Sequence, residues 1–194
     1  MKKEEFEDWV KGLSPKDQQQ AKSFYTTIRR NKDNTLKYVP YNQEYKDLLE
    51  PAAKYMHEAA DDLAQLGALE EKGTRIDTFL RSRADALMSN DYLPSELDWL
   101  SLSKSNKLEV TAGPYEVYTD AIFGFKSAYE FYVHVRDEES SRLLEAFSDL
   151  QFVEDHLPIP DKYRNEKLIP APIAVVNQLY SGGDVSVSRG ALHS

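Results

Sequence analysis

The sequence predicts an α+β fold that is mostly helical, with a small antiparallel or mixed sheet. Apolar residues recur at helical spacing through most of the first 100 residues, and strand-like alternation begins near Lys107. A chain of 194 residues is also long enough to bury a core. We expect a helical region over 1–105, a strand-helix-strand region over 106–180 and an irregular tail over 181–194.

Four segments of the helical region have apolar residues at helical spacing. Ser14-Pro15-Lys16-Asp17 opens the first with a hydroxyl cap, a proline at the first helical position and an acid near the positive end. This helix is expected to continue through Ile28 and to end at the polar stretch 31–34. Pro51 lies inside the second segment, so that helix either starts or kinks there. The segments are 15–28, 45–69, 76–87 and 94–99.

The second region begins with two strand-like segments. Residues 108–112 alternate between apolar and polar, and Gly113-Pro114 is expected to turn or bulge the chain. The alternation is clearest over 127–136. A helix is then expected over 138–150, and the apolar segment 173–180 is a candidate further strand.

Composition excludes several classes of function. The net charge is −9 and the isoelectric point is near 5.0, which argues against nucleic-acid binding and against docking on anionic membranes. The absence of cysteine excludes disulfides, thiolate nucleophiles and cysteine-ligated metals. There is no signal-peptide pattern and no apolar run of about 18 residues, so a cytoplasmic location is expected.

Histidines offer one candidate metal site. His57-Glu58-Ala59-Ala60-Asp61 resembles a zincin helix, but an aspartate stands where the second histidine belongs. The segment is either a solvated helix face or a metal site built from His57 and nearby acids. The other histidines are His134, His156 and His193, and none has a second metal ligand at useful spacing. We therefore expect no metal ligand and no catalytic residue in this chain.

The densest polar cluster is Gly113-Pro114-Tyr115-Glu116-Val117-Tyr118-Thr119-Asp120, with Lys126 and Glu130 soon after. Carboxylates at strand ends could hold the amino terminus of a peptide, and tyrosines could hold its backbone. Paired carboxylates could also perform acid–base catalysis. The alternative is an edge strand with salt bridges.

This cluster, followed by Phe123-Gly124-Phe125-Lys126-Ser127-Ala128-Tyr129-Glu130-Phe131, resembles the dipeptidyl-peptidase III family of zinc hydrolases. Bacterial-type members, including relatives fused to Nudix domains, are the most similar. The resemblance extends over roughly residues 40–185. It is carried also by segments 89–95, 98–99, 171–177 and 183–184.

The resemblance implies a two-lobed metallopeptidase. Its zinc would lie on a later helical segment with a His-Glu-x-x-x-His or His-Glu-x-x-Gly-His motif, and this chain is expected to be the portion before that motif. Glu116, Tyr118 and Asp120 would then support either substrate binding or sheet geometry. Thr111 departs from the family's tyrosine two positions before the motif glycine, which puts dipeptidyl-peptidase activity in question. Residues 186–194 also depart from the family and suggest a truncated or frame-shifted reading frame.

Two functions therefore remain open. The chain is expected to be part of a zinc-dependent hydrolase, inactive alone, whose full-length form binds a peptide or another small substrate. Its isolated form would associate through an exposed apolar patch. The alternative is a non-catalytic helical module for protein interaction.

Overall fold

The computed structural model describes residues 1–66, 74–103, 106–117, 124, 126–145, 150–168 and 174–183. Within these ranges the fold is α+β, as the sequence predicts. It combines helices with a two-stranded and a three-stranded sheet, both antiparallel. No described helix is long and apolar enough to cross a bilayer.

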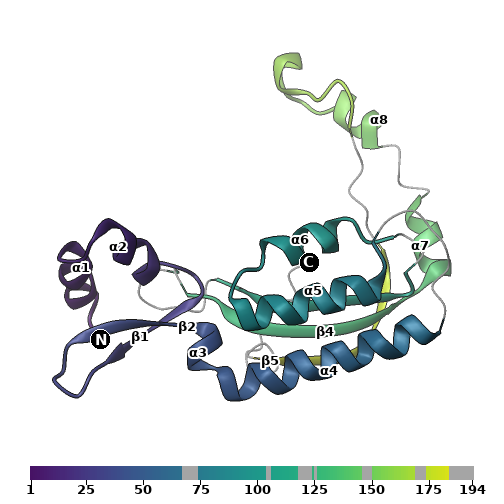
Figure 1. Cartoon of the computed structure of the whole chain (residues 1–194). Helices are drawn as coiled ribbons and strands as arrows, with labels where there is room; N and C mark the ends of the chain where they lie inside the picture. Colours follow the sequence, from purple (N-terminus) through teal and green to yellow (C-terminus); the bar gives the residue numbers. More distant parts are fainter. Residues whose placement is uncertain are drawn as a thin grey trace.

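The N-terminal part forms a small unit at one end of the molecule (Figure 1). Helices α1 (Lys3–Lys11) and α2 (Pro15–Ala21) precede a hairpin of β1 (Thr26–Arg30) and β2 (Leu36–Pro40). Ser14 caps α2 as expected, because its hydroxyl accepts a hydrogen bond of 3.2 Å from the amide of Asp17. A cluster of three buried residues holds the unit together: Phe6, Val10 and Ala21.

The hairpin corrects the expected first helix, which ends at Ala21 and does not continue through Ile28. The apolar residues between 21 and 28 fit a helical spacing by coincidence, because residues 26–30 pair with 36–40. Asn34 adopts a left-handed conformation, with φ of 71°, in the turn between the two strands. Asparagine tolerates that conformation better than most residues, so the stretch expected to end a helix reverses a hairpin.

Three further helices follow the hairpin and the short helix α3 (Tyr41–Glu44). They are α4 (Lys46–Gln65), α5 (Ile76–Ser89) and α6 (Leu93–Leu100). Pro51 lies inside α4, so the helix does not start there. Proline lacks an amide hydrogen, and α4 therefore loses one hydrogen bond to the carbonyl of Asp47 near its first turn.

The main sheet has the strand order β3-β4-β5. These strands are Leu108–Glu116, Ala128–Arg136 and Val176–Gly183. The strand expected over 173–180 is therefore present, and it continues through Gly183. Residues 184–194 of the expected tail lie outside the described residues. Between β4 and β5 lie α7 (Glu138–Glu145), α8 (Leu150–Asp155) and a 3-10 turn over Asp161–Tyr163.

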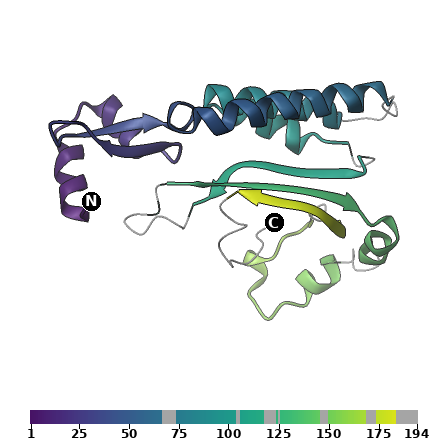
Figure 2. The same ribbon diagram turned by 90° about the horizontal axis from the view of Figure 1, so that it is seen from below.

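Helices cover one face of this sheet (Figure 2). Phe79 and Leu80 of α5 pack with Val110 and Ala112 of β3, together with Ala60 of α4. The residues opposite Val110 and Ala112 on β4 are Val133 and Phe131, so these four side chains share the helix-facing side. The other face carries the intervening, more polar residues.

Tyrosines form a second cluster between the helices and the start of β4. The hydroxyl of Tyr41 donates a hydrogen bond of 2.6 Å to the carbonyl of Ser127, and the hydroxyls of Tyr92 and Tyr129 lie 3.1 Å apart. Burial raises the pKa of Tyr92 to about 12, so its hydroxyl stays protonated at neutral pH. The cluster joins α3, the start of α6 and β4.

Lys126 connects the N-terminal unit to the main sheet. Its ammonium group donates hydrogen bonds to the carbonyls of Ala21 and Ser23 and to the hydroxyl of Thr26, at 2.7–2.8 Å. These acceptors surround the end of α2, where free carbonyl groups favour a cation. Lys126, which stood in the polar cluster of the sequence, thus bonds to the N-terminal unit.

Gly183, at the end of β5, allows us to test the packing of the sheet edge. Its φ is +84°, and a Cβ there would collide with the backbone of Tyr129 and approach the Cα of Glu130 to 3.1 Å. We expect Gly183→Ala to lower the free energy of unfolding by about 2–4 kcal/mol in urea denaturation. Gly12→Ala is the matched control, because Gly12 has φ of −79° and a Cβ there would make only ordinary van der Waals contacts, the nearest at 3.5 Å from the carbonyl oxygen of Trp9. Equal effects of the two substitutions would contradict the prediction.

Candidate functional site

A bulge in β3 builds the candidate site. Gly113 lies opposite Glu130 and Glu116 lies opposite Ala128, so three residues of β3 span the distance that two residues span on β4. In a regular strand Gly113 and Glu116 would face opposite sides. The extra residue of the bulge returns Glu116 to the face that carries Glu130. The turn or bulge expected at Gly113-Pro114 is therefore a bulge.

The two carboxyl groups that the bulge brings together are buried. Glu116 is 6% exposed and Glu130 is 5% exposed, and both lie on one face of the sheet, on neighbouring strands. Burial, and then the adjacent Glu116, raise the pKa of Glu130. Among the described residues, Oε2 of Glu116 has no hydrogen-bond partner. The two carboxyl groups therefore place several hydrogen-bond acceptors close together, and one of these oxygens, Oε2 of Glu116, is unpaired among the described residues.

Other polar side chains extend this face of the sheet, which we call the polar face. Tyr132 is 5% exposed, and its ring stacks on His134 with the centroids 5.7 Å apart. Burial and the charges of the two glutamates raise the pKa of Tyr132. Glu109 forms an ion pair with Arg136 at the opposite end of the strands. His134 lies on this face, as expected for a polar-face strand residue.

A buried cation lies on the helix side of the bulge. The side chain of Arg83 is fully buried, and its Nη2 donates a hydrogen bond of 2.8 Å to Oε1 of Glu96. Tyr115 donates to the same oxygen at 2.8 Å. A Cβ at Gly113 would approach Nη1 of Arg83 to 3.2 Å, so the bulge leaves room for the guanidinium group. Three rings surround this group at 5.4–5.6 Å: Phe79, Tyr92 and Tyr115.

The structure tests the placement of only part of the expected site. Glu116 lies on the polar face beside Glu130, whereas Tyr118 and Asp120 lie outside the described residues. Sequence reasoning placed Glu130 in the polar cluster but did not select it as a site residue. The alternation over 127–136 does place Glu130 on the face opposite the apolar residues. Its pairing with Glu116 depends on the bulge, whose position no spacing reveals.

The residues considered for a metal lie on exposed helix faces. Nε2 of His57 lies 3.2 Å from Asp85, and Asp61 forms an ion pair of 2.7 Å with Arg81. Within the described part of the chain, no three histidine, aspartate or glutamate residues gather as metal ligands. These residues do not fit the zinc centre that the family resemblance implies. His156 bonds through Nδ1 to the carbonyl of Phe152, and His193 lies outside the described residues.

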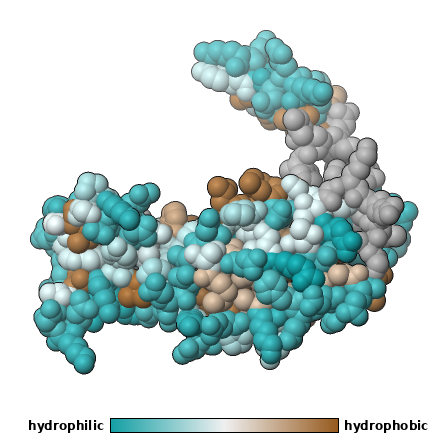
Figure 3. Space-filling model, viewed as in Figure 1, coloured by the Kyte–Doolittle hydropathy of each residue, from teal (hydrophilic) through white to brown (hydrophobic). Residues whose placement is uncertain are grey.

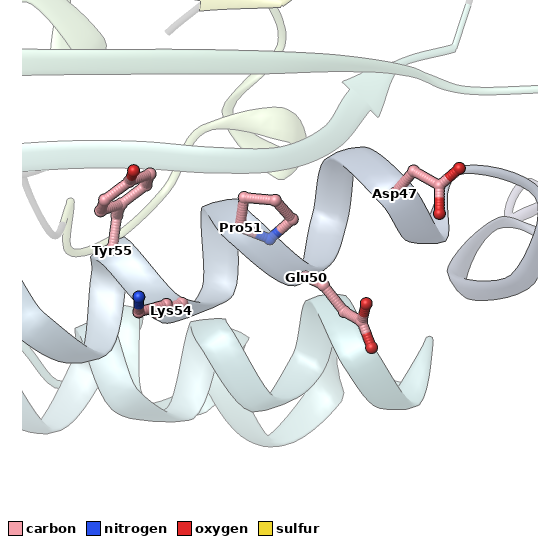
Figure 4. Close-up of a pocket in the computed structure, with 5 residues that line it drawn as sticks. All are labelled: Asp47, Glu50, Pro51, Lys54 and Tyr55. Carbon is pink, nitrogen blue, oxygen red and sulfur yellow. The ribbon is translucent and has the colours of Figure 1, made fainter.

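A surface hollow along α4 is a weaker candidate than the polar face (Figure 4). Five residues of this single helix line it, and all are exposed. Lys54 of this hollow lies 3.6 Å from Glu58 in an ordinary surface ion pair. Such a site lacks the buried polar groups that fix a ligand's orientation. The lining residues are Asp47, Glu50, Pro51, Lys54 and Tyr55.

The buried Arg83 predicts the effect of removing its counterion. Glu96→Gln leaves the guanidinium group buried without a negative charge, so we expect a loss of about 2–4 kcal/mol in the free energy of unfolding. Tyr115→Phe removes one hydrogen bond to the same carboxylate and should cost about 1 kcal/mol. Glu50→Gln is the control, because Glu50 pairs with Lys46 at 3.5 Å on an exposed face. A cost for Glu96→Gln no larger than the control's would contradict this assignment.

The sequence has relatives among known proteins. No family model matches the chain. It is 31% identical over 206 residues to Nudix hydrolase 3 of Arabidopsis thaliana, covering 95% of this chain and 25% of that protein.

Two solved structures extend the similarity to the fold. Dipeptidyl-peptidase III of Caldithrix abyssi matches with 37% identity and a TM-score of 0.79. Dipeptidyl-peptidase III of Corallococcus sp. strain EGB matches with 41% identity and a TM-score of 0.72. Each match covers 95% of this chain but 33% of the solved chain. The chain is thus similar, over nearly its whole length, to a third of a dipeptidyl-peptidase III structure.

Proposed function

We propose that this chain forms part of a zinc-dependent peptidase of the dipeptidyl-peptidase III type, and that its polar face contacts the substrate. The observation that carries the proposal is the buried carboxyl pair, in which Oε2 of Glu116 has no partner among the described residues. The similarity to two structures named dipeptidyl-peptidase III, at 37–41% identity, supports the type of enzyme. A cytoplasmic location, with which the absence of cysteine is compatible, belongs to the same proposal.

The polar face suits one end of a peptide. A carboxylate in a site of low dielectric constant attracts an ammonium group more strongly than it would in water. Glu116 would therefore hold the amino terminus of the substrate, and Tyr118 and Asp120 would contribute further contacts. Because the described residues do not fit a zinc centre, the proposal assigns cleavage to residues outside this chain. The chain alone is then inactive.

The role of Glu116 can be tested in the larger enzyme of which, by this proposal, the chain forms part. If these residues bind substrate, Glu116→Gln, Tyr118→Phe and Asp120→Asn should each raise KM for a dipeptidyl substrate about tenfold. That change corresponds to a loss of about 1.4 kcal/mol of binding. Glu58→Gln, on an exposed face of α4, is the matched control.

Unchanged KM in all three variants would refute the assignment of these residues. The proposal as a whole has a separate test on the isolated chain. It would be refuted if that chain alone held stoichiometric zinc and cleaved peptides. It would also fail if no His-Glu zinc motif followed within a few hundred codons in any reading frame.

A second candidate, a module for protein interaction, is favoured by the outer face of α6. Leu93, Leu97 and Leu100 lie on one side of this helix and are 66%, 55% and 71% exposed. Figure 3 shows hydrophobic side chains gathered over this helix. Exposed apolar patches of this kind mark interaction sites or drive association.

Self-association tests whether this face of α6 is an interaction surface, which both candidates allow. We expect the isolated chain to associate at high concentration, and Leu97→Glu with Leu100→Glu to reduce that association, as measured by sedimentation velocity. Leu48→Glu is the control, because Leu48 is 72% exposed but lies on α4. A chain that stays monomeric would contradict the expectation.

A further inference from the structure

We propose that Glu130 is a positioning residue that shares a single proton with Glu116, so that the buried pair carries one negative charge. The sharing itself is a property of this chain. Its consequence for catalysis rests on the proposed function, in which Glu116 contacts the substrate.

The placement of the two side chains favours a proton between them. Glu116 and Glu130 lie on neighbouring strands and on one face of the sheet, and a hydrogen bond between their side chains contributes, after burial, to the raised pKa of Glu130. Ionised carboxylates are acceptors only, so such a bond needs one of the two carboxyl groups to be protonated. They are also 94% or more buried, since their exposed fractions are 6% and 5%. Two adjacent negative charges at such a site would repel each other with little screening by water.

The charged neighbours on the polar face do not neutralise the pair. Arg136 is already paired with Glu109, and Tyr132 and His134 stack on each other. Burial, and then the two nearby carboxyl groups, raise the pKa of Tyr132, so its hydroxyl stays neutral. In the described part of the chain, neither Glu116 nor Glu130 forms a salt bridge. A proton is therefore the counterion that the described surroundings leave available.

The cations nearest the bulge bond to other groups. Arg83 lies on the helix side against Gly113 and bonds through Nη2 to Glu96, whereas its Nε and Nη1 have no partner among the described residues. Lys126, two residues before β4, donates to the N-terminal unit. On β5, Gly183 lies opposite Glu130 and offers no side chain.

The pair should therefore keep its proton near neutral pH. Burial and the adjacent carboxyl group raise the pKa of Glu130 to about 7, from an ordinary value of 4.5. With the proton held between the two groups, Oε2 of Glu116 stays free to accept a hydrogen bond from a ligand.

Carboxyl NMR on the isolated chain tests the sharing directly. In protein labelled with ¹³C at the glutamate side-chain carboxyl, we expect one resonance with an apparent pKa near 7 in the wild type. It should be absent from Glu130→Gln and shifted to lower pH in Glu116→Gln, in which Glu130 stays buried but loses the adjacent carboxyl group. Glu58→Gln should leave it in place. If every glutamate carboxyl of the wild type titrates below pH 5.5, the proposal is wrong.

The pH dependence of stability gives a second readout. The pKa of Glu130 is raised in the folded state, so this contribution is complete below pH 4.5 and is lost as the pH rises through about 7. The urea midpoint of the wild type should therefore fall between pH 5 and pH 8 relative to that of Glu130→Gln. The glutamine amide can donate the hydrogen bond permanently, so this variant should lose that part of the pH dependence. Parallel midpoints would overturn the proposal.

Catalysis in the larger enzyme distinguishes positioning from a purely structural role. If Glu130 sets the charge of Glu116, the alkaline side of the kcat/KM profile should shift in Glu130→Gln while Glu58→Gln keeps the wild-type profile. An unshifted profile, together with a titration near pH 7 in the isolated chain, would refute positioning but not the shared proton. Absence of that titration would refute the shared proton whatever the enzyme's activity.

Discussion

The placement of the polar side chains at this end of the main sheet depends on the extra residue in β3. A regular strand would direct Glu116 into the helix-facing core, where Phe79, Val110 and Ala112 pack. The bulge instead places a carboxyl group beside Glu130 on one side and leaves space for a guanidinium group on the other. One irregularity in strand pairing therefore affects polar groups on both faces of the sheet, Glu116 on one face and Arg83 on the other. Bulges are common where a strand must redirect a side chain toward a site.

Most of the fold could be predicted from the sequence because its elements have strong local periodicity. Helices α4 and α5 and strand β4 lie where the apolar spacing placed them. The hairpin at 26–40 was missed because pairing between distant segments overrides a short helical spacing. A signal was present nonetheless: Thr26-Thr27-Ile28 is rich in β-branched residues and is followed by a polar turn over 31–34.

The site was less predictable than the fold. Glu116 stood out through its motif, and the alternation of β4 was sufficient to place Glu130 on the polar face. Their contact required a strand register that spacing alone does not give. Arg83 showed no signal, because a charged residue in a helical stripe ordinarily faces solvent, yet its side chain is fully buried. Long-range packing thus decided which polar residues became part of the site.

The hydrogen bonds of Lys126 also have a consequence for the order in which this protein folds during synthesis. Lys126 and the carbonyl of Ala21 are 105 residues apart in the chain. The helices and hairpin of the N-terminal unit are local and can form early on the ribosome. Their attachment to the rest of the protein must wait until β4 has been translated. Until then, the carbonyl groups of Ala21 and Ser23 in the nascent N-terminal unit lack the hydrogen bonds that the ammonium group of Lys126 later donates.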